Sequence, residues 1–219
     1  MNARNRTTVG QTYLYLLILS FAFLNSPVTA DEKPADVKLE PIFNGKDLTG
    51  WTLEKPGAKP PDPATKSYWK SLDGILVGES DDAKKGSMLY TEKAYKDVAV
   101  EAEVRWSGDI DSGIMVRKPE VQVQIGVSRS LKVDMTASIY AKGGYAGKAQ
   151  GVKEVLKEGD WNRLRVEARG PVFKVWLNGR HVLTWESPDY PDAAPIGLQI
   201  HGGVKMKVEF KDIKAAELK

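Results

Sequence analysis

The sequence predicts an all-β domain built as a sandwich of two antiparallel sheets, and three observations support this prediction. Segments of alternating apolar and polar residues, the period of a β-strand, recur along most of the chain after residue 67. Turn residues separate these segments, and Asn178-Gly179 is the strongest hairpin signal, because a type I′ turn requires positive φ at both central residues. No segment shows a convincing helical period. Roughly a dozen short antiparallel strands in one domain pack as two stacked sheets, in a sandwich or a jelly roll.

Residues 1–30 have the pattern of an export signal. Arg4 and Arg6 provide the positive start, residues 13–24 form an apolar run, and Val28-Thr29-Ala30 fits a small-x-small cleavage site. The apolar run is too short to cross a bilayer, which takes about 20 residues. The sequence therefore predicts a signal peptide over 1–30 and a location in the periplasm or outside the cell, with an uncleaved N-terminal anchor as the alternative.

The remaining chain is predicted to form a leader and one domain. Residues 31–41 are charged and interrupted by proline, which predicts a flexible leader. From 42 to 219 the sequence shows no internal repeat and indicates a single sandwich or jelly-roll domain. The proline-rich stretch 54–66 is predicted to be a surface loop.

The clearest strand is predicted over residues 97–106. Val98, Val100 and Val104 lie on one face of it, and Glu101 and Glu103 lie on the other. The other strand-like segments follow in chain order at 113–117, 120–126, 137–142, 161–185, 195–203 and 205–218. One outer face of such a sandwich meets water, and the other is expected to form a polar groove.

Composition and motifs exclude several classes of function. The whole chain carries a formal net charge of +3, and removing Arg4 and Arg6 with the signal leaves +1, so no basic surface for nucleic acid is expected. No HExxH, P-loop or GxSxG motif occurs, there is no Cys, and two His residues do not support a dedicated zinc site. No cofactor is predicted, although Asp109 and Asp111 leave a bound calcium ion open. The sequence makes no prediction of the oligomeric state.

An unusual set of polar side chains marks the candidate site. Carboxylate, amide, guanidinium, phenol and imidazole groups together suit a neutral, polyhydroxylated ligand such as a sugar. The strand-borne members of this set are Arg117, Glu120, Gln122, Gln124, Tyr140, Gln199 and His201. Trp69, near the proline-rich stretch, is the best candidate for a ring that stacks on a sugar face.

Each of these residues also has a structural explanation. Gln122 and Gln124 fit a pair of amides that bond across strands, and a single histidine such as His201 is often a structural residue. Glu103 fits either a carboxylate pair with Glu101 for glycosidic chemistry or a solvated outer face.

Several motifs together resemble one bacterial family. The matching segments are FNGKDLTGW (43–51), EVRW (103–106), DSGIMVR (111–117), PEVQ (119–122), GDWN (159–162), LNG (177–179), LQIHG (198–202) and VEFKDIKAAEL (208–218). On these segments the chain resembles the 3-keto-disaccharide hydrolase domains, also described as 3-keto-glucoside 1,2-lyase/3-keto-2-hydroxy-glucal hydratase domains and formerly a domain of unknown function. The resemblance covers nearly the whole chain after the leader.

The resemblance implies a concanavalin A-like jelly roll and a keto-sugar substrate. It implies net hydrolysis by elimination and hydration, with Glu120 and His201 as acid and base in either order. The residues expected to hold the sugar or the enolate are Arg117, Gln122, Gln124, Gln199, Tyr140, Glu103 and Trp69.

The chain departs from the family pattern at several positions. It has Asp111 where the family often has Asn, and Ile200 where the family often has Asp. A non-catalytic carbohydrate-binding module is therefore the alternative, and a structural cell-envelope protein is a weaker third hypothesis.

Overall fold

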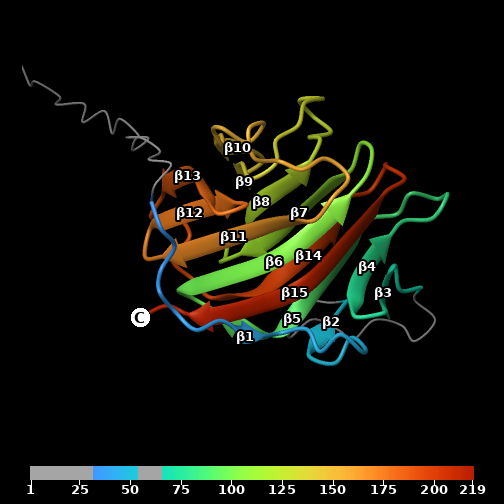
Figure 1. The fold of residues 1–219 in the computed structure, drawn as a ribbon, viewed down its shortest axis with the longest axis horizontal. Coiled ribbons are helices and arrows are strands. Elements are labelled where there is room, and N and C mark those ends of the chain that lie inside the picture. Colours follow the sequence, from blue (N-terminus) through green and yellow to red (C-terminus); the bar gives the residue numbers. More distant parts are fainter. Residues whose placement is uncertain (1–31, 54–65) are drawn as a thin grey trace, which may run out of the picture.

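The structure, a computed structural model, describes residues 32–53 and 66–219 and consists of two stacked antiparallel sheets (Figure 1). No helix occurs in these residues. The predicted signal peptide and nearly all of the proline-rich stretch lie outside them. Within the described ranges, no helix is long and apolar enough to span a membrane.

The first sheet, called sheet A here, has the strand order β13-β12-β11-β6-β15-β4-β3, with β1 paired to β15. Its strands are β1 (Glu40–Pro41), β3 (Trp69–Leu72), β4 (Ile75–Glu79), β6 (Val98–Trp106), β11 (Asn162–Arg169), β12 (Val172–Leu177), β13 (Arg180–Glu186) and β15 (Lys207–Glu217). Neighbours in the sheet are often far apart in sequence, as β6 and β15 are.

The second sheet, called sheet B here, has the order β10-β9-β8-β7-β14-β5-β2. Its strands are β2 (Trp51–Thr52), β5 (Ser87–Tyr95), β7 (Asp111–Val116), β8 (Val121–Gly126), β9 (Ile139–Ala141), β10 (Gly144–Gly147) and β14 (Ala194–Ile200). Strand β7 lies between β8 and β14, which brings residues 122 and 199 onto adjacent parts of one face.

The core lies between the two sheets and follows the predicted alternation. On β6, Val98, Val100 and Val104 are buried, and on β8 Val123 and Ile125 are buried. Full burial of one such side chain contributes about 1.5–3 kcal/mol. The predicted all-β sandwich of two antiparallel sheets is thus confirmed, and the polar residues of β8 are left on the outer face of sheet B.

The predicted hairpin at residues 178–179 is also confirmed. Asn178 and Gly179 join β12 to β13, with φ values of 51° and 84°. Positive φ at both positions is the requirement of a type I′ turn.

Residues 32–41 of the predicted leader lie against sheet A, and the flexibility of this segment stays a prediction. The backbone N–H of Ala35 donates to Glu167 Oε1 at 2.8 Å, and Arg165 Nη2 donates to the carbonyl of Ala35 at 2.8 Å. Trp176 Nε1 donates to the carbonyl of Glu32 at 2.7 Å. The segment crosses sheet A (Figure 1) because these buried polar groups require partners that water does not supply.

Candidate functional site

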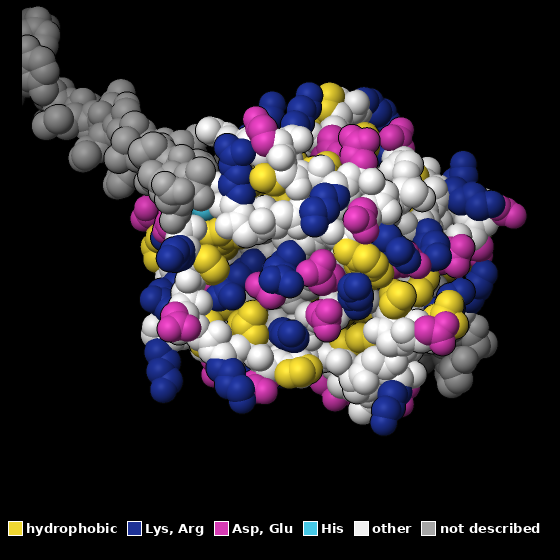
Figure 2. Space-filling model, in the orientation of Figure 1, with side chains coloured by type: hydrophobic (Ala, Val, Ile, Leu, Met, Phe, Trp, Pro, Cys, Tyr) yellow, Lys and Arg dark blue, Asp and Glu magenta, His cyan; other side chains and the backbone are white. Residues whose placement is uncertain are grey.

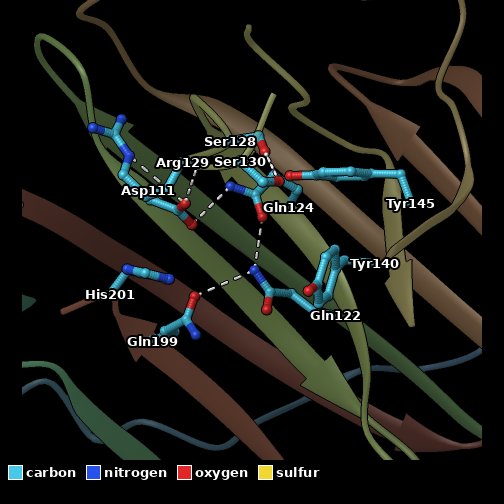
Figure 3. Close-up of a pocket in the computed structure, with 10 residues that line it drawn as sticks. All are labelled: Asp111, Gln122, Gln124, Ser128, Arg129, Ser130, Tyr140, Tyr145, Gln199 and His201. Carbon is cyan, nitrogen blue, oxygen red and sulfur yellow. Dashed lines mark hydrogen bonds and ion pairs between the residues drawn. The ribbon is translucent and has the colours of Figure 1, made fainter. Parts of the chain in front are cut away.

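An open polar pocket of about 180 Å³ lies on the outer face of sheet B (Figure 3). The ten residues that line it are Asp111, Gln122, Gln124, Ser128, Arg129, Ser130, Tyr140, Tyr145, Gln199 and His201. None of them is a large aliphatic residue, so the pocket suits a hydrated ligand rather than an apolar one.

Strand register brings the polar side chains together. Gln122 and Gln124 are two residues apart on β8 and so share one face. Gln122 pairs with Tyr140 on β9, and Tyr140 pairs with Tyr145 on β10. The rings of Tyr140 and Tyr145 meet edge to face with centroids 5.3 Å apart. This contact makes one wall of the pocket.

A chain of side-chain amides runs across the pocket floor. Gln122 Nε2 donates to Gln124 Oε1 at 2.7 Å and to Gln199 Oε1 at 3.2 Å. Gln124 Nε2 in turn donates to Asp111 Oδ1 at 3.0 Å. The three glutamines therefore form one connected network that ends on a carboxylate.

Gly113 makes this network possible. It lies on β7, between the strands that carry Gln122 and Gln199. A Cβ atom at position 113 would lie 2.6 Å from Gln122 Cγ and 2.8 Å from its Nε2. The glycine leaves the space through which the Gln122 amide crosses β7.

The loop after β8 holds the carboxylate end of the network. Asp111 Oδ2 accepts a hydrogen bond from the backbone N–H of Arg129 at 3.0 Å, and Arg129 Nε lies 3.8 Å from the same oxygen. Both carboxylate oxygens of Asp111 therefore have donors. Nearby, burial raises the pKa of the Tyr145 phenol, which keeps this hydroxyl protonated.

His201 presents one ring nitrogen to the pocket. Its Nδ1 lies 2.6 Å from the carbonyl oxygen of Gly202. A carbonyl only accepts, so in the neutral ring Nδ1 carries the hydrogen and Nε2 keeps a lone pair. Within the described residues Nε2 makes no hydrogen bond, and the ring points toward the amide network (Figure 3). This nitrogen has the character of a general base.

The pocket contains five of the predicted residues and five others. The predicted residues that line the pocket are Gln122, Gln124, Tyr140, Gln199 and His201. The five not predicted as ligand contacts are Asp111, Ser128, Arg129, Ser130 and Tyr145. The sequence marks Asp111 only as a possible calcium ligand, and the other four residues lie on a loop and an edge strand where no alternation of polar residues indicates a site.

Glu120 does not lie in this pocket, so the predicted pair of Glu120 and His201 is not assembled. The backbone of His201 bonds to Asp111, and Asp111 pairs with Gly126, six residues beyond Glu120. Six strand residues span roughly 20 Å at about 3.3 Å each. Glu120 Oε1 instead accepts a hydrogen bond from the Tyr90 hydroxyl at 3.3 Å.

Arg117 also lies elsewhere, because it leaves the strand alternation. It has a φ of 64° and is 1% exposed. Its Nη2 forms an ion pair with Asp97 Oδ1 at 2.8 Å and donates to the carbonyl of Gly170 at 3.1 Å. Burial lowers the pKa of the Arg117 guanidinium, and the Asp97 carboxylate opposes that shift. Arg117 therefore has a structural role.

Glu103 and Trp69 belong to sheet A and not to the pocket. Glu103 lies on its outer face, where Arg163 Nε donates to Glu103 Oε1 at 3.1 Å. That face carries intermixed positive and negative side chains (Figure 2). Trp69 is 3% exposed and packs over Gly78, where a Cβ would lie 2.6 Å from its ring. It is a core residue and offers no stacking surface.

The described residues contain no group of three or more His, Asp or Glu side chains arranged to hold a metal ion. Both oxygens of Asp111 receive protein donors. The absence of a cofactor stays a prediction.

Comparisons with known proteins agree with this fold. A presumed glycosyl hydrolase from Parabacteroides distasonis has 23% identity and a TM-score of 0.60, covering 83% of this chain and 94% of its own. Carbohydrate binding module CBM66 from Bacillus subtilis has 15% identity and a TM-score of 0.56, covering 81% and 100%. A Bacillus subtilis protein of unknown function with a galectin-like fold has 11% identity and a TM-score of 0.59, covering 85% and 97%. At these identities the likeness shows the fold alone.

The fold and the pocket together define a jelly-roll protein with a polar site on one sheet. The profile of the 3-keto-alpha-glucoside-1,2-lyase-like domain matches residues 38–216, and the chain belongs to that family. This confirms the resemblance seen in the sequence motifs. No curated protein matches the chain.

Proposed function

We propose that this protein is an exported enzyme that cleaves 3-keto-glycosides by elimination and hydration, and that the polar pocket on sheet B is its active site. The family supports the substrate class. The observation that supports the proposal most is the orientation of His201. Its Nδ1 bonds to the Gly202 carbonyl, so Nε2 keeps a lone pair and can act as a base. Three glutamine side chains line the same pocket. Export rests on the signal pattern of residues 1–30.

The proposed reaction begins at the proton on C2 of the sugar. A ketone at C3 makes this proton acidic, and His201 Nε2 removes it as general base. The negative charge moves to the C3 oxygen, where the Nε2 group of Gln199 donates a hydrogen bond. The bond from C1 to the glycosidic oxygen then breaks, and a double bond forms between C1 and C2.

The leaving oxygen needs a proton, and water must then restore the sugar. The Tyr140 hydroxyl lines the same pocket and is the proposed acid for the departing oxygen. Water adds its oxygen to C1 and a proton returns to C2, so the net change is hydrolysis. This scheme needs one base and one acid, and it does not need the carboxylate pair of a glycosidase that acts through an oxocarbenium ion.

A carbohydrate-binding module is the second candidate, because Asp111, the carboxylate that lines the pocket with His201, has both oxygens bonded to protein donors. The fold is also shared with CBM66. A module of this kind would bind the same sugars without releasing the aglycone.

The test is aglycone release from a panel of 3-keto-glucosides, with the unoxidised glucosides as substrate controls. We expect release from the keto forms alone, and a loss of at least about 100-fold in kcat/KM in His201→Gln, as for a general base. Glu103→Gln, on the opposite sheet, is the matched control and should retain activity. Saturable binding without turnover would reject the enzyme in favour of the binding module.

A further inference from the structure

Two crossovers between the sheets lie side by side next to His201. Residues 80–86 join β4 of sheet A to β5 of sheet B, and residues 201–206 join β14 of sheet B to β15 of sheet A. The backbone N–H of Gly203 in the second crossover donates to the carbonyl of Lys84 in the first at 2.8 Å. The segment that begins with His201 is therefore held by a neighbour that is distant in sequence.

The crossover 80–86 is itself held in place at its start. The Ser80 side chain is 5% exposed, and its hydroxyl accepts from the backbone N–H of Met206 at 2.8 Å. Asp81 closes the turn that follows, because its carbonyl accepts from the N–H of Lys84 at 3.0 Å. These contacts make the Lys84 carbonyl an acceptor with a defined position.

The hydrogen bond of Gly203 orients the carbonyl that contacts His201. The Gly203 N–H and the Gly202 carbonyl belong to one planar trans peptide unit, in which the two groups point in opposite directions. Because the N–H is directed at the Lys84 carbonyl, the Gly202 oxygen is directed away from it, and this oxygen lies 2.6 Å from His201 Nδ1. Rotation of this peptide unit would remove the acceptor from Nδ1.

Gly86 leaves the space that this arrangement needs. A Cβ atom at position 86 would lie 2.9 Å from Gly202 N and 3.1 Å from the carbonyl oxygen of Ile200. Both are backbone atoms, so the segment on either side of His201 would have to shift. Gly86 does not have a positive φ, so the close approach of the backbones, and not the backbone conformation, requires a glycine here.

We propose that Lys84 and Gly86 are positioning residues that hold the Gly202–Gly203 peptide so that His201 keeps its hydrogen on Nδ1 and its lone pair on Nε2. This inference rests on the proposed function, in which Nε2 is the general base. A neutral ring without this acceptor exchanges between two tautomers, and the tautomer with hydrogen on Nε2 cannot take up a proton there. The crossover 80–86 thereby selects the basic form of the ring, although none of its residues lines the pocket.

Two substitutions disturb the crossover in different ways. Gly86→Ala places a Cβ against the neighbouring backbone. Lys84→Pro forbids the φ of 53° that directs the Lys84 carbonyl, because proline holds φ near −65°. Lys84→Gly is the conservative variant, because glycine accepts positive φ and keeps the carbonyl. Gly78→Ala is the stability control, because its Cβ would lie 2.6 Å from the Trp69 ring on sheet A.

The first readout is the tautomer of His201, which needs no ligand. The chain has two histidines, so NMR of the imidazole nitrogens observes two rings, and His201→Gln assigns them. At a pH where the ring is neutral, we expect hydrogen on Nδ1 alone in the wild type, Lys84→Gly and Gly78→Ala. We expect a mixture of tautomers in Gly86→Ala and in Lys84→Pro, and the exposed position of Lys84 keeps the test open if Gly86→Ala does not fold. Hydrogen on Nε2 in the wild type, or an unchanged tautomer in the disturbed variants, would overturn the proposal.

The second readout is turnover of a 3-keto-glucoside. We expect kcat to fall by about ten-fold or more in Gly86→Ala and Lys84→Pro, with KM nearly unchanged, because a general base acts in the transition state. Gly78→Ala should keep its kcat. A mixed tautomer with an unchanged kcat would overturn the role of the crossover in catalysis. If the wild type turns over no keto sugar, the proposed function fails, while the tautomer pattern still supports the positioning of His201.

Discussion

The side-chain amide of Gln122 reaches Gln199 by lying directly over Gly113, on the strand between them. A glycine at this position is therefore part of the site, although it offers no side chain to a ligand. The relationship makes the amide network of the pocket depend on the packing of β7.

Gly113→Ala tests this dependence. The added Cβ would lie 2.6 Å from Gln122 Cγ, so Gln122 must leave its position and lose the bond to Gln199. We expect at least about a ten-fold fall in kcat/KM for a 3-keto-glucoside, in line with the loss of a positioned hydrogen bond. Gly144→Ala is the control, because a Cβ there meets no atom within 4 Å. Equal activity of both variants would contradict the account of the network.

The buried position of Arg117 predicts an effect on stability and not on catalysis. Arg117→Met removes the ion-pair partner of Asp97 and the donor to the Gly170 carbonyl, and it should lower the free energy of unfolding by about 3 kcal/mol or more. Arg163→Met removes an exposed ion pair and should change it by less than about 1 kcal/mol. Denaturant unfolding measures both values. A stable Arg117→Met protein that no longer binds the sugar would return Arg117 to the list of ligand contacts.

The contacts of the leader with sheet A predict that trimming it costs stability. A chain that begins at Val37 lacks the backbone groups that bond to Arg165, Glu167 and Trp176. Each lost hydrogen bond contributes about 0.5–1.5 kcal/mol, and 1 kcal/mol corresponds to about 2–4 °C for a domain of this size. We expect the Tm to fall by at least about 5 °C relative to a chain that begins at Glu32. Identical melting curves would instead support the flexible leader predicted from the sequence.

The half-buried phenol of Tyr145 predicts a loss of stability at alkaline pH. Its pKa is raised by burial, so the phenol stabilises the folded state fully below the ordinary pKa of about 10, and this contribution is lost as the pH rises toward the folded pKa. Thermal melts between pH 8 and 11 should therefore show a steeper decline for the wild type than for Tyr145→Phe. Parallel curves for the two proteins would show that Tyr145 does not titrate in this way.

The alternation of residues predicted which side chains share a face but not which strands are neighbours. Val98 to Val104 and Val121 to Ile125 were placed correctly because a two-residue period is a local property. Gln122 and Gln199 are 77 positions apart in the sequence, and only the sheet order β8-β7-β14 makes them adjacent. Their contact follows from the pairing of strands that are distant in sequence, and the sequence of a short segment does not predict that pairing.

The predicted residues that fell outside the pocket did so for identifiable reasons. Arg117 has a positive φ and lies just after a strand, so the alternation of faces expected for a strand residue does not apply to it. Trp69 is covered because Gly78 on the neighbouring strand leaves room for its ring. Conversely, Arg129 belongs to the site because the loop that carries it folds back on Asp111 and its backbone N–H donates to that carboxylate. The residue types of the loop do not predict this contact.

The most direct test of the proposed chemistry is the fate of the C2 hydrogen during cleavage. We would follow by NMR the incubation of a 3-keto-glucoside with the wild-type protein and with His201→Gln in D₂O. We expect the wild type to replace the C2 hydrogen with deuterium as the aglycone is released, and His201→Gln to do neither. Aglycone release with the C2 hydrogen retained would contradict it, because the glycosidic bond would then break without the proton abstraction assigned to His201.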